Sequence, residues 1–262
     1  MRNFIVYRLL MFVRRISRTL YTRRAEWVGG KPVDAWDDYH LVAILNHTSL
    51  YEFLFASMVP ARFLKRMARH GVVPIASKTI ERPVIGKFWK WIAGNVVSIS
   101  RERDHTWEKV MQSIDPNSMI IILPEGRMKR ANGLDSKGNP MTVRGGIADI
   151  LLEMSEGRML LACSLGLHHI QVPGQTIPKL FQHVDMRFEQ FDIAEYRERL
   201  MARCERKRDF RRAVIEDLTL RRDRYCVPPM GAEIVPVPLD GPPIPPVPSE
   251  AVADAVPAES PG

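Results

Sequence analysis

The chain has 262 residues, 45% of them hydrophobic, which is enough to bury one sizeable core, so we expect one main domain. Its formal net charge is +8, but the segment after residue 226 holds five acidic residues and no Lys or Arg. Residues 1–226 therefore have 38 basic and 25 acidic residues and a net charge of +13. This charge favours an anionic partner such as phospholipid, a phosphorylated substrate or nucleic acid. Three cysteines without metal-ligand spacing argue against a disulfide framework and predict a reducing compartment.

The N-terminal 24 residues contain seven arginines and no acidic residue. Apolar side chains recur among them at helical spacing, at Phe4, Ile5, Leu9, Phe12, Val13, Ile16 and Leu20. Such a basic amphipathic helix either lies in the interface of an anionic bilayer or packs on the chain's own domain. The absence of acidic residues favours the bilayer, so we expect residues 1–37 to form a membrane-interface segment of a peripheral or monotopic protein on the cytoplasmic face. Arg8 interrupts the first apolar run, so neither a signal peptide nor a spanning helix is expected.

Between residues 38 and 190, short apolar runs alternate with helical patterns. We predict strands at 41–45, 72–76, 95–100, 119–123 and 159–163, and helices at 104–114 behind an Asp104 N-cap and at 142–154 behind Thr142. Continuous apolar strands separated by helices are typical of a parallel sheet with both faces covered. The predicted fold class is therefore α/β, with a central, largely parallel sheet covered by helices, in one domain of residues 38–226.

A strongly basic helix is predicted to complete this domain, from about Ile193 to Arg222. The final segment, residues 227–262, carries 11 of the 20 prolines, and we predict that it is a disordered or polyproline-like tail. The expected architecture thus has an amphipathic helical motif at its N-terminus and a basic helix near its C-terminus.

Polar residues follow the first predicted strand in the stretch LVAILNHTSLYEFLF, residues 41–55. A histidine at a strand end can act as a general base, and a carboxylate that orients its ring improves it. His47 and Glu52 can meet only if His47 lies in the loop before a helix and Glu52 in its first turn, which is where the sequence puts them. Ser49 and Glu52 also spell a capping box, S-x-x-E, in which the carboxylate only caps the helix. Both roles remain open, and they compete for one carboxylate.

A second candidate site follows the strand predicted at 119–123, in the stretch IIILPEGRMKR. Glu125 and Gly126 open the loop, and three cations come after them: Arg127, Lys129 and Arg130. The glycine permits close approach to the backbone, and the cations suit a phosphate. Taken alone, however, the motif favours an ordinary acidic–basic surface turn.

The stretch GNVVSISRERD adds Arg101 and Arg103 after another predicted strand, which alone would be an exposed charge cluster. Taken in order, NHTSLYE, GNVVSISR, LPEGR and the following VRGG resemble the motifs of the glycerolipid acyltransferase family, which includes 1-acylglycerol-3-phosphate acyltransferases. The family's first motif is Asn-His, four residues, then Asp; its second ends in Arg after a Gly and an apolar strand; its third reads Pro-Glu-Gly-Thr-Arg. The resemblance spans roughly residues 40 to 170.

This resemblance implies an O-acyltransferase of phospholipid biosynthesis and lipid metabolism. It would move a fatty acyl group from acyl-CoA or acyl-carrier protein, as co-substrate, to the hydroxyl of a lysophospholipid or 1-acylglycerol-3-phosphate. His47 would be the general base and Glu52 would orient it. The implied substrate-binding residues are Asn46, Arg101, Glu125, Gly126 and Arg127, with Arg101 on the acceptor phosphate. The implied fold joins a two-helix, membrane-facing N-terminal motif to an α/β domain, and we expect anionic membrane lipid as a partner, no cofactor, no metal and no specific nucleic acid.

The sequence departs from the family's pattern in three places. Glu52 stands where the family has Asp, which adds one methylene, and no proline occurs near MLLACSLGLHH, where the family has one. After Gly126, the Thr-Arg pair is missing, because Met128 occupies the position of the Arg. The phosphate-binding cation of this loop is therefore one of three: Arg127, Lys129 or Arg130. Acceptor selectivity is the property that these changes affect most.

Two other functions fit parts of the sequence. The stretch ACSLG, residues 162–166, approximates the nucleophile elbow of a serine hydrolase, with Ser164 as nucleophile and His183 as the later histidine. Alternatively, the arginines near both ends fit a non-enzymatic protein that binds membranes or nucleic acid through phosphate contacts. No nucleic-acid recognition motif and no interleaved aromatic residues support the second hypothesis.

Overall fold

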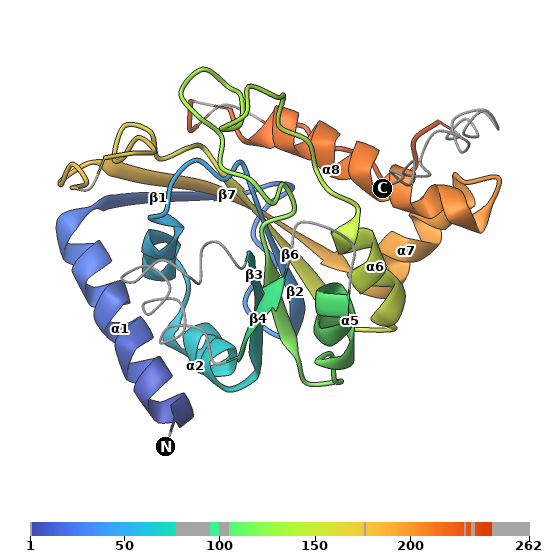
Figure 1. The fold of residues 1–262 in the computed structure, drawn as a ribbon, viewed down its shortest axis with the longest axis horizontal. Coiled ribbons are helices and arrows are strands. Elements are labelled where there is room, and N and C mark those ends of the chain that lie inside the picture. Colours follow the sequence, from blue (N-terminus) through green and yellow to red (C-terminus); the bar gives the residue numbers. More distant parts are fainter. Residues whose placement is uncertain are drawn as a thin grey trace, which may run out of the picture.

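A seven-stranded sheet forms the centre of the protein in the computed structural model, which describes residues 2–76, 95–99, 105–175, 177–227, 229–231 and 234–242 (Figure 1). The strands are β1 (Thr22–Trp27), β2 (Tyr39–Leu45), β3 (Gly71–Ala76), β4 (Asn95–Ile99), β5 (Met119–Ile122), β6 (Arg158–Ser164) and β7 (His183–Asp192). Their spatial order is β1-β7-β6-β2-β5-β3-β4, and every neighbouring pair is parallel except β6 and β7. The predicted α/β class with a largely parallel sheet is confirmed, as are the five predicted strands.

Helices cover both faces of this sheet. They are α1 (Arg2–Leu20), η1 (Glu52–Ser57), α2 (Ala61–His70), α5 (His105–Gln112), α6 (Gly146–Glu153), α7 (Ile193–Ala202), η2 (Lys207–Asp209) and α8 (Phe210–Tyr225). The N-terminal α1 packs with η1 and α2 on one side, whereas α5, α6, α7 and α8 lie on the other (Figure 1). Each side has its own apolar core against the sheet.

Strand β2 shows why its sequence is a continuous apolar run. Leu41, Ala43 and Leu45 face the core under α6 and α8, whereas Val42 faces the core under α1 and α2. Because successive side chains point to opposite faces, a strand that is covered on both sides must be apolar throughout. β5 and β6 flank β2 in parallel, so the loops that follow all three strands leave the same edge of the sheet.

Helix α1 has a buried apolar stripe and an exposed one. Val6, Leu10 and Val13 are buried in the core. Four large apolar side chains are exposed on other faces: Phe4, Ile5, Phe12 and Ile16. Within the described residues, no helix is both long and apolar enough to cross a bilayer. The N-terminal motif has one helix followed by a strand, so the two-helix arrangement implied by the family resemblance is wrong for this chain.

Two strands of the sheet were not predicted. β1 lies inside the segment 1–37, carries exposed charged residues and pairs only with β7 at the edge of the sheet. The charged side chains on one face of β7 are buried and paired with β1. Asp185 pairs with Arg24, and Arg187 donates to Glu26 at 2.9 Å. These ion pairs allow a charged sequence to occupy a mostly buried strand.

The C-terminal part also differs from the single helix predicted from Ile193 to Arg222. The chain forms α7 and α8 with η2 between them. Five of the six residues 203–208 are charged, and Cys204 is the one that packs against the apolar core. Residues 234–242 belong to the segment predicted as a disordered tail, but they lie against these helices. Val237 is buried, its N–H donates to Tyr225 Oη at 2.5 Å, and its carbonyl accepts from Arg221 at 3.0 Å.

Helix α6 starts four residues later than the predicted position behind Thr142. Met141 and Val143 are buried as extended chain, and the N–H of Arg144 donates to the carbonyl of Pro124 at 2.8 Å. This bond fastens the stretch before α6 to the loop after β5. Asp104, the N-cap predicted for α5, lies outside the described residues.

Candidate active site

The loop that leaves β2 is held in an uncommon backbone conformation. Asn46 has φ +62°, a left-handed value that asparagine tolerates better than most residues. Its side-chain amide donates to the carbonyl of Ser164 at 2.9 Å, and its Oδ1 accepts from Lys129 Nζ at 3.4 Å. Asn46 therefore turns its side chain into the protein and fixes the direction in which the next residue leaves the strand.

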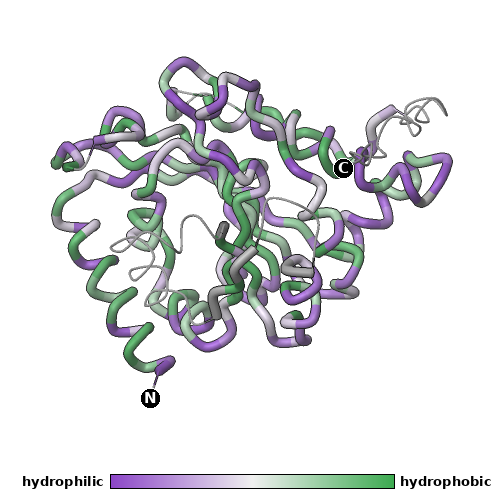
Figure 2. The backbone as a smooth tube through the Cα atoms, in the orientation of Figure 1, coloured by the Kyte–Doolittle hydropathy of each residue, from purple (hydrophilic) through white to green (hydrophobic). Residues whose placement is uncertain are grey.

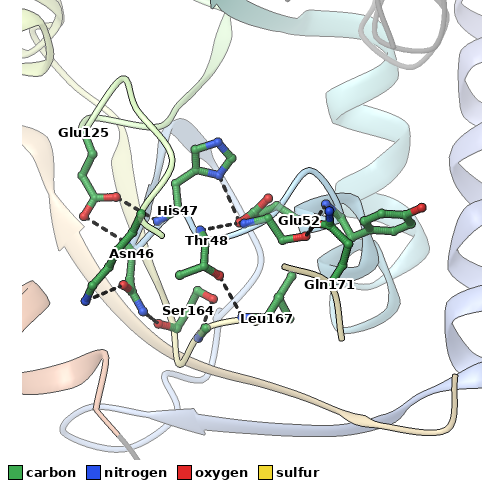
Figure 3. A network of polar contacts seen from close by, with 12 residues as sticks. Asn46, His47, Thr48, Glu52, Glu125, Ser164, Leu167 and Gln171 are labelled. Carbon is green, nitrogen blue, oxygen red and sulfur yellow. Dashed lines mark hydrogen bonds and ion pairs between the residues drawn. The ribbon is translucent and has the colours of Figure 1, made fainter. Parts of the chain in front are cut away.

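His47 and Glu52 come together as the sequence predicts. Nδ1 of His47 lies 3.0 Å from Oε1 of Glu52 (Figure 3). The angle at Nδ1 does not meet the geometry of a hydrogen bond, so the contact between the ring and the carboxylate is chiefly electrostatic. The imidazole side chain is 17% exposed and that of Glu52 is 5% exposed. The second ring nitrogen points away from Glu52 (Figure 3).

The capping role of Glu52 is present as well. Its Oε1 accepts the backbone N–H groups of Thr48 and Ser49, each at 3.0 Å (Figure 3). Because one oxygen atom receives both bonds and also faces the ring, the capping and orienting roles do not exclude each other. The element that Glu52 begins is the short 3-10 helix η1, whereas the sequence pattern predicts an amphipathic helix.

The surroundings of His47 favour its charged form. Burial lowers the pKa of His47, but Glu52, and to a smaller degree Glu125, raise it, and the net result is a raised pKa. A histidine with a raised pKa is a stronger base once it has lost its proton, and it returns the proton more slowly than an ordinary one.

Glu125 holds the same loop from its other side. Its carboxylate accepts the N–H of Asn46 at 3.3 Å and the N–H of His47 at 2.8 Å (Figure 3). Arg222 of α8 approaches the same carboxylate at 3.7 Å. Burial raises the pKa of Glu125, and its contacts with His47 and Arg222 oppose that shift. Two buried carboxylates thus clamp the loop that carries the imidazole.

The loop after Gly126 crosses over this clamp. The N–H of Lys129 donates to the carbonyl of His47 at 2.7 Å. Arg127 pairs with the buried carboxylate of Asp135, whose pKa is held well below its ordinary value chiefly by the N–H of Asn139. Of the three cations predicted for phosphate binding, Arg127 is therefore neutralised by a neighbour, and Arg130 is exposed.

A cavity of about 980 Å³ lies beside this loop and includes His47, Glu52, Glu125 and Gly126 in its wall. Apolar side chains from the sheet face under α1, from η1 and from α2 line one part, among them Leu10, Val42, Phe55, Val59, Phe63, Leu64, Met67 and Ile121. Four arginines line another part: Arg127, Arg130, Arg144 and Arg211. The wall of the cavity therefore contains apolar and cationic side chains as well as the imidazole.

Sequence reasoning missed the two arginines of this wall that come from other elements. Arg144 belongs to the VRGG stretch, so the motif itself was the signal. Arg211 lies at the start of α8, and nothing in its sequence neighbourhood points to the site. It packs so closely on Gly145 that a Cβ there would lie 1.8 Å from its Nε, so glycine is needed for Arg211 to lie against the loop.

The other predicted positions fare differently. Arg101 lies outside the described residues. Ser164 is fully buried, and its Oγ accepts the N–H of Gly166 at 3.0 Å. His183, the histidine predicted to act with it, is exposed at the start of β7, and the ring of His169 contacts its carbonyl. This arrangement contradicts the serine hydrolase hypothesis. Among the described residues, no cluster of three or more His, Cys, Asp and Glu side chains could hold a metal ion.

The comparisons with known proteins agree with this geometry. The model of the family described as Acyltransferase matches residues 32–171, more than half of the chain. The chain belongs to the acyltransferase family. Among solved structures, the 1-acyl-sn-glycerophosphate (LPA) acyltransferase PlsC from Thermotoga maritima has a similar fold, with a TM-score of 0.52 and 15% identity over 84% of this chain and 78% of that chain. A search of curated protein sequences found no match. The family membership makes this acyltransferase an enzyme, which removes the hypothesis of a non-enzymatic binder.

Proposed function

We propose that this acyltransferase moves a fatty acyl group from acyl-CoA or acyl-carrier protein to the hydroxyl of a lysophospholipid or 1-acylglycerol-3-phosphate. The observation that carries the proposal is the imidazole of His47 beside Glu52, in the wall of a cavity that is lined by both apolar side chains and arginines. In such a cavity the apolar side chains can bind an acyl chain, and the arginines can bind a phosphate group.

In the proposed mechanism, the ring nitrogen of His47 that faces away from Glu52 takes the proton of the acceptor hydroxyl. The oxygen then attacks the thioester carbon, the C–S bond breaks, and the departing thiolate receives the proton from the imidazolium. Glu52 stabilises the imidazolium and holds the ring, and it is itself held by the two N–H groups it caps. Glu125 and Gly126 shape the wall beside the reacting atoms, with Glu125 fixing the backbone of His47.

The two parts of the cavity suit the two substrates. Apolar side chains on the α1 side would hold the acyl chain, since burial of each CH₂ group contributes about 0.8 kcal/mol. The acceptor phosphate would bind at the cationic end. Arg101 and Arg127 are the residues that the family motifs suggest, and Arg144 and Arg211 support the same role because they line the cavity. Asn46 would act through the loop that it fixes.

We also propose that α1 rests on the cytoplasmic face of an anionic membrane. Its exposed apolar side chains, together with exposed Arg8 and Arg15, support an interfacial position. Arg14 and Arg18 instead hold α1 beside η1. Arg14 donates to the carbonyl of Val59 at 3.1 Å, and Arg18 donates to the carbonyl of Ser57 at 3.0 Å.

The proposal is tested with purified protein in vesicles that contain anionic lipid, labelled acyl-CoA or acyl-carrier protein, and a panel of lysolipid acceptors. His47→Ala should lose about 10²–10⁴-fold in kcat/KM, because a general base contributes that much. His169→Ala is the matched control, since that ring is exposed and contacts only a backbone carbonyl. Acyl transfer that survives in folded His47→Ala protein contradicts the mechanism, and absence of transfer with every donor and acceptor contradicts the substrate class.

The pH dependence of this reaction follows from the raised pKa of His47. Only the neutral imidazole accepts a proton, so kcat/KM should rise with pH through a pKa above the ordinary value of 6.5. Glu52→Gln removes the neighbouring negative charge, which lowers the pKa and moves the rising limb to lower pH while the maximal rate falls. A limb that stays in place in Glu52→Gln would show that Glu52 does not act on the ring.

A further inference from the structure

The loop between β6 and β7 carries an exposed apolar tip, residues 177–181. Ile177 is 82% exposed, Leu180 is 43% exposed and Phe181 is 73% exposed. Isolated exposed apolar side chains are normal, but three within five residues form a patch that is typical of an interaction surface. We propose that the 177–181 tip inserts into the surface of an anionic bilayer and forms a second membrane contact beside α1.

The tip is fixed in place by backbone bonds to its surroundings. The N–H of Phe181 donates to the carbonyl of Leu20, the last residue of α1, at 2.8 Å. Lys179 donates its N–H to the carbonyl of Ile170 at 2.8 Å. Phe181 itself has φ +58°, which is uncommon for a bulky residue, and its ring is nevertheless left in solvent. The fold therefore holds an apolar ring outward at a conformational cost.

The tip and α1 occupy one edge of the molecule. α1 ends beside the loop, where Phe181 is bonded to Leu20, and hydrophobic residues occur in both segments (Figure 2). Ile5, Phe12 and Ile16 of α1 are exposed on the helix face that does not pack on the core. The tip thus lies at the C-terminal end of α1, and we expect a bilayer that receives the exposed face of the helix to reach it.

The charge of this edge favours anionic lipid as the occupant. Residues 164–183 contain no Asp or Glu, and Lys179 is exposed within the tip. The outward cations of α1 include Arg8 and Arg15. Large apolar side chains with adjacent cations and no acidic residue match the apolar and phosphate layers of a membrane surface.

The same loop also reaches the active-site cavity. Pro173 and Gly174 line that cavity together with Leu50 and Phe53. Insertion of the tip would therefore bring the cavity next to the lipid phase, where an acceptor with a fatty chain resides. This part of the inference rests on the proposed lipid substrate, whereas membrane insertion of the tip can be measured without turnover.

The test uses the full chain and sucrose-loaded vesicles of phosphatidylcholine and phosphatidylglycerol. Replacing all three apolar residues of the tip by Ser leaves the charge unchanged and should weaken vesicle binding about tenfold or more, because binding scales with the apolar area inserted. Leu220→Ser is the matched control, since Leu220 is exposed on α8, away from this edge (Figure 1). Its vesicle binding should equal that of the unsubstituted protein.

A second variant tests insertion directly. Phe181→Trp should gain fluorescence that brominated lipids quench, beyond the quenching of the native tryptophans. Unchanged binding of the triple Ser variant, or no additional quenching, overturns the proposal. Vesicle binding that persists while transfer from acyl-carrier protein alone is lost would also overturn it, and would assign the tip to a protein partner. Loss of vesicle binding with an inactive parent enzyme would contradict the proposed function but not the inference.

Discussion

Helices α1 and α8 are both rich in arginine, but they use it in opposite ways (Figure 1). In α1, Arg8 and Arg15 are exposed and the helix has no acidic residue. In α8, Arg221 is fully buried between Glu189 at 2.6 Å and Asp217 at 2.8 Å, and its guanidinium lies 4.6 Å from the ring centroid of Phe191. A high net charge therefore indicates an anionic partner only where the structure leaves the cations uncompensated.

The acidic partners of α8 come from distant elements, which is why its sequence resembles a free basic helix. Glu189 lies on β7, and Glu125 follows β5, where it meets Arg222. Arg211 lines the active-site cavity. The arginines of α8 thus contact acidic residues elsewhere in the fold, including Glu125 beside the His47 loop, whereas Arg8 and Arg15 of α1 stay at the surface.

Among substitutions of arginines in α1 and α8, Arg221→Ala is expected to have the largest effect, and that effect is on stability. Removing the guanidinium leaves Glu189 and Asp217 buried without their cation, which should lower the free energy of unfolding by about 3–5 kcal/mol. Chemical denaturation measures the change. Arg224→Ala is the control, because Arg224 is exposed on the same helix. A stability loss for Arg221→Ala no larger than that of the control would remove the distinction between the two helices.

A smaller effect, on activity, is expected for Arg222→Gln. Arg222 opposes the rise that burial causes in the pKa of Glu125. Without this cation the pKa rises further, more of the carboxyl is protonated, and it accepts the N–H of His47 less well. We expect kcat/KM to fall on the order of tenfold at neutral pH, equivalent to about 1.4 kcal/mol.

The direction of the pH effect distinguishes this explanation from a general structural defect. Because Glu125 must be ionised to hold the loop, the deficit of Arg222→Gln should widen as the pH falls and narrow as it rises. A deficit that is the same at every pH would mean that α8 supports the site only by packing.

The smallest effects are expected for single arginines of α1. Arg8→Gln and Arg15→Gln should each weaken binding to anionic vesicles by about 1 kcal/mol at low salt, with little change in stability. Arg18→Gln should do the reverse, lowering the free energy of unfolding by about 1 kcal/mol because Arg18 donates to the carbonyl of Ser57. Equal salt-dependent losses of vesicle binding for all three variants would contradict the division into inward and outward arginines.

Local pattern was enough to predict the central strands and the contact between His47 and Glu52. A short, continuous apolar run such as 119–123 is best explained in an α/β chain as a buried strand. The spacing of His47 and Glu52 allows the two side chains to meet only if His47 lies in the loop before the helix. β7 was missed even though Val184, Met186 and Phe188 alternate strictly; the residues between them, Asp185 and Arg187, are charged and yet buried. Their burial depends on partners in β1 and α8.

The cationic side of the site depends still more on tertiary structure. The sequence offers Arg127 as a phosphate ligand, but its pairing with Asp135 is formed by the folding of the loop between them. Arg211 reaches the cavity only because α8 packs beside Gly145. The sequence shows which residues follow the strands and so meet at one edge of the sheet. It does not show which of the cations there are paired with a carboxylate and which remain available for a ligand.

The parallel pairing of β1 with β7 also constrains the order in which the chain assembles. Arg23 is opposite Val184, so the edge of the sheet closes between residues that are 161 positions apart in the chain. At typical rates of synthesis, the ribosome needs roughly 10–30 s to produce that length. During this interval β1 has no neighbouring strand, and α1 emerges first, so the helix that we propose to rest on lipid leaves the ribosome before the loop that carries His47 exists.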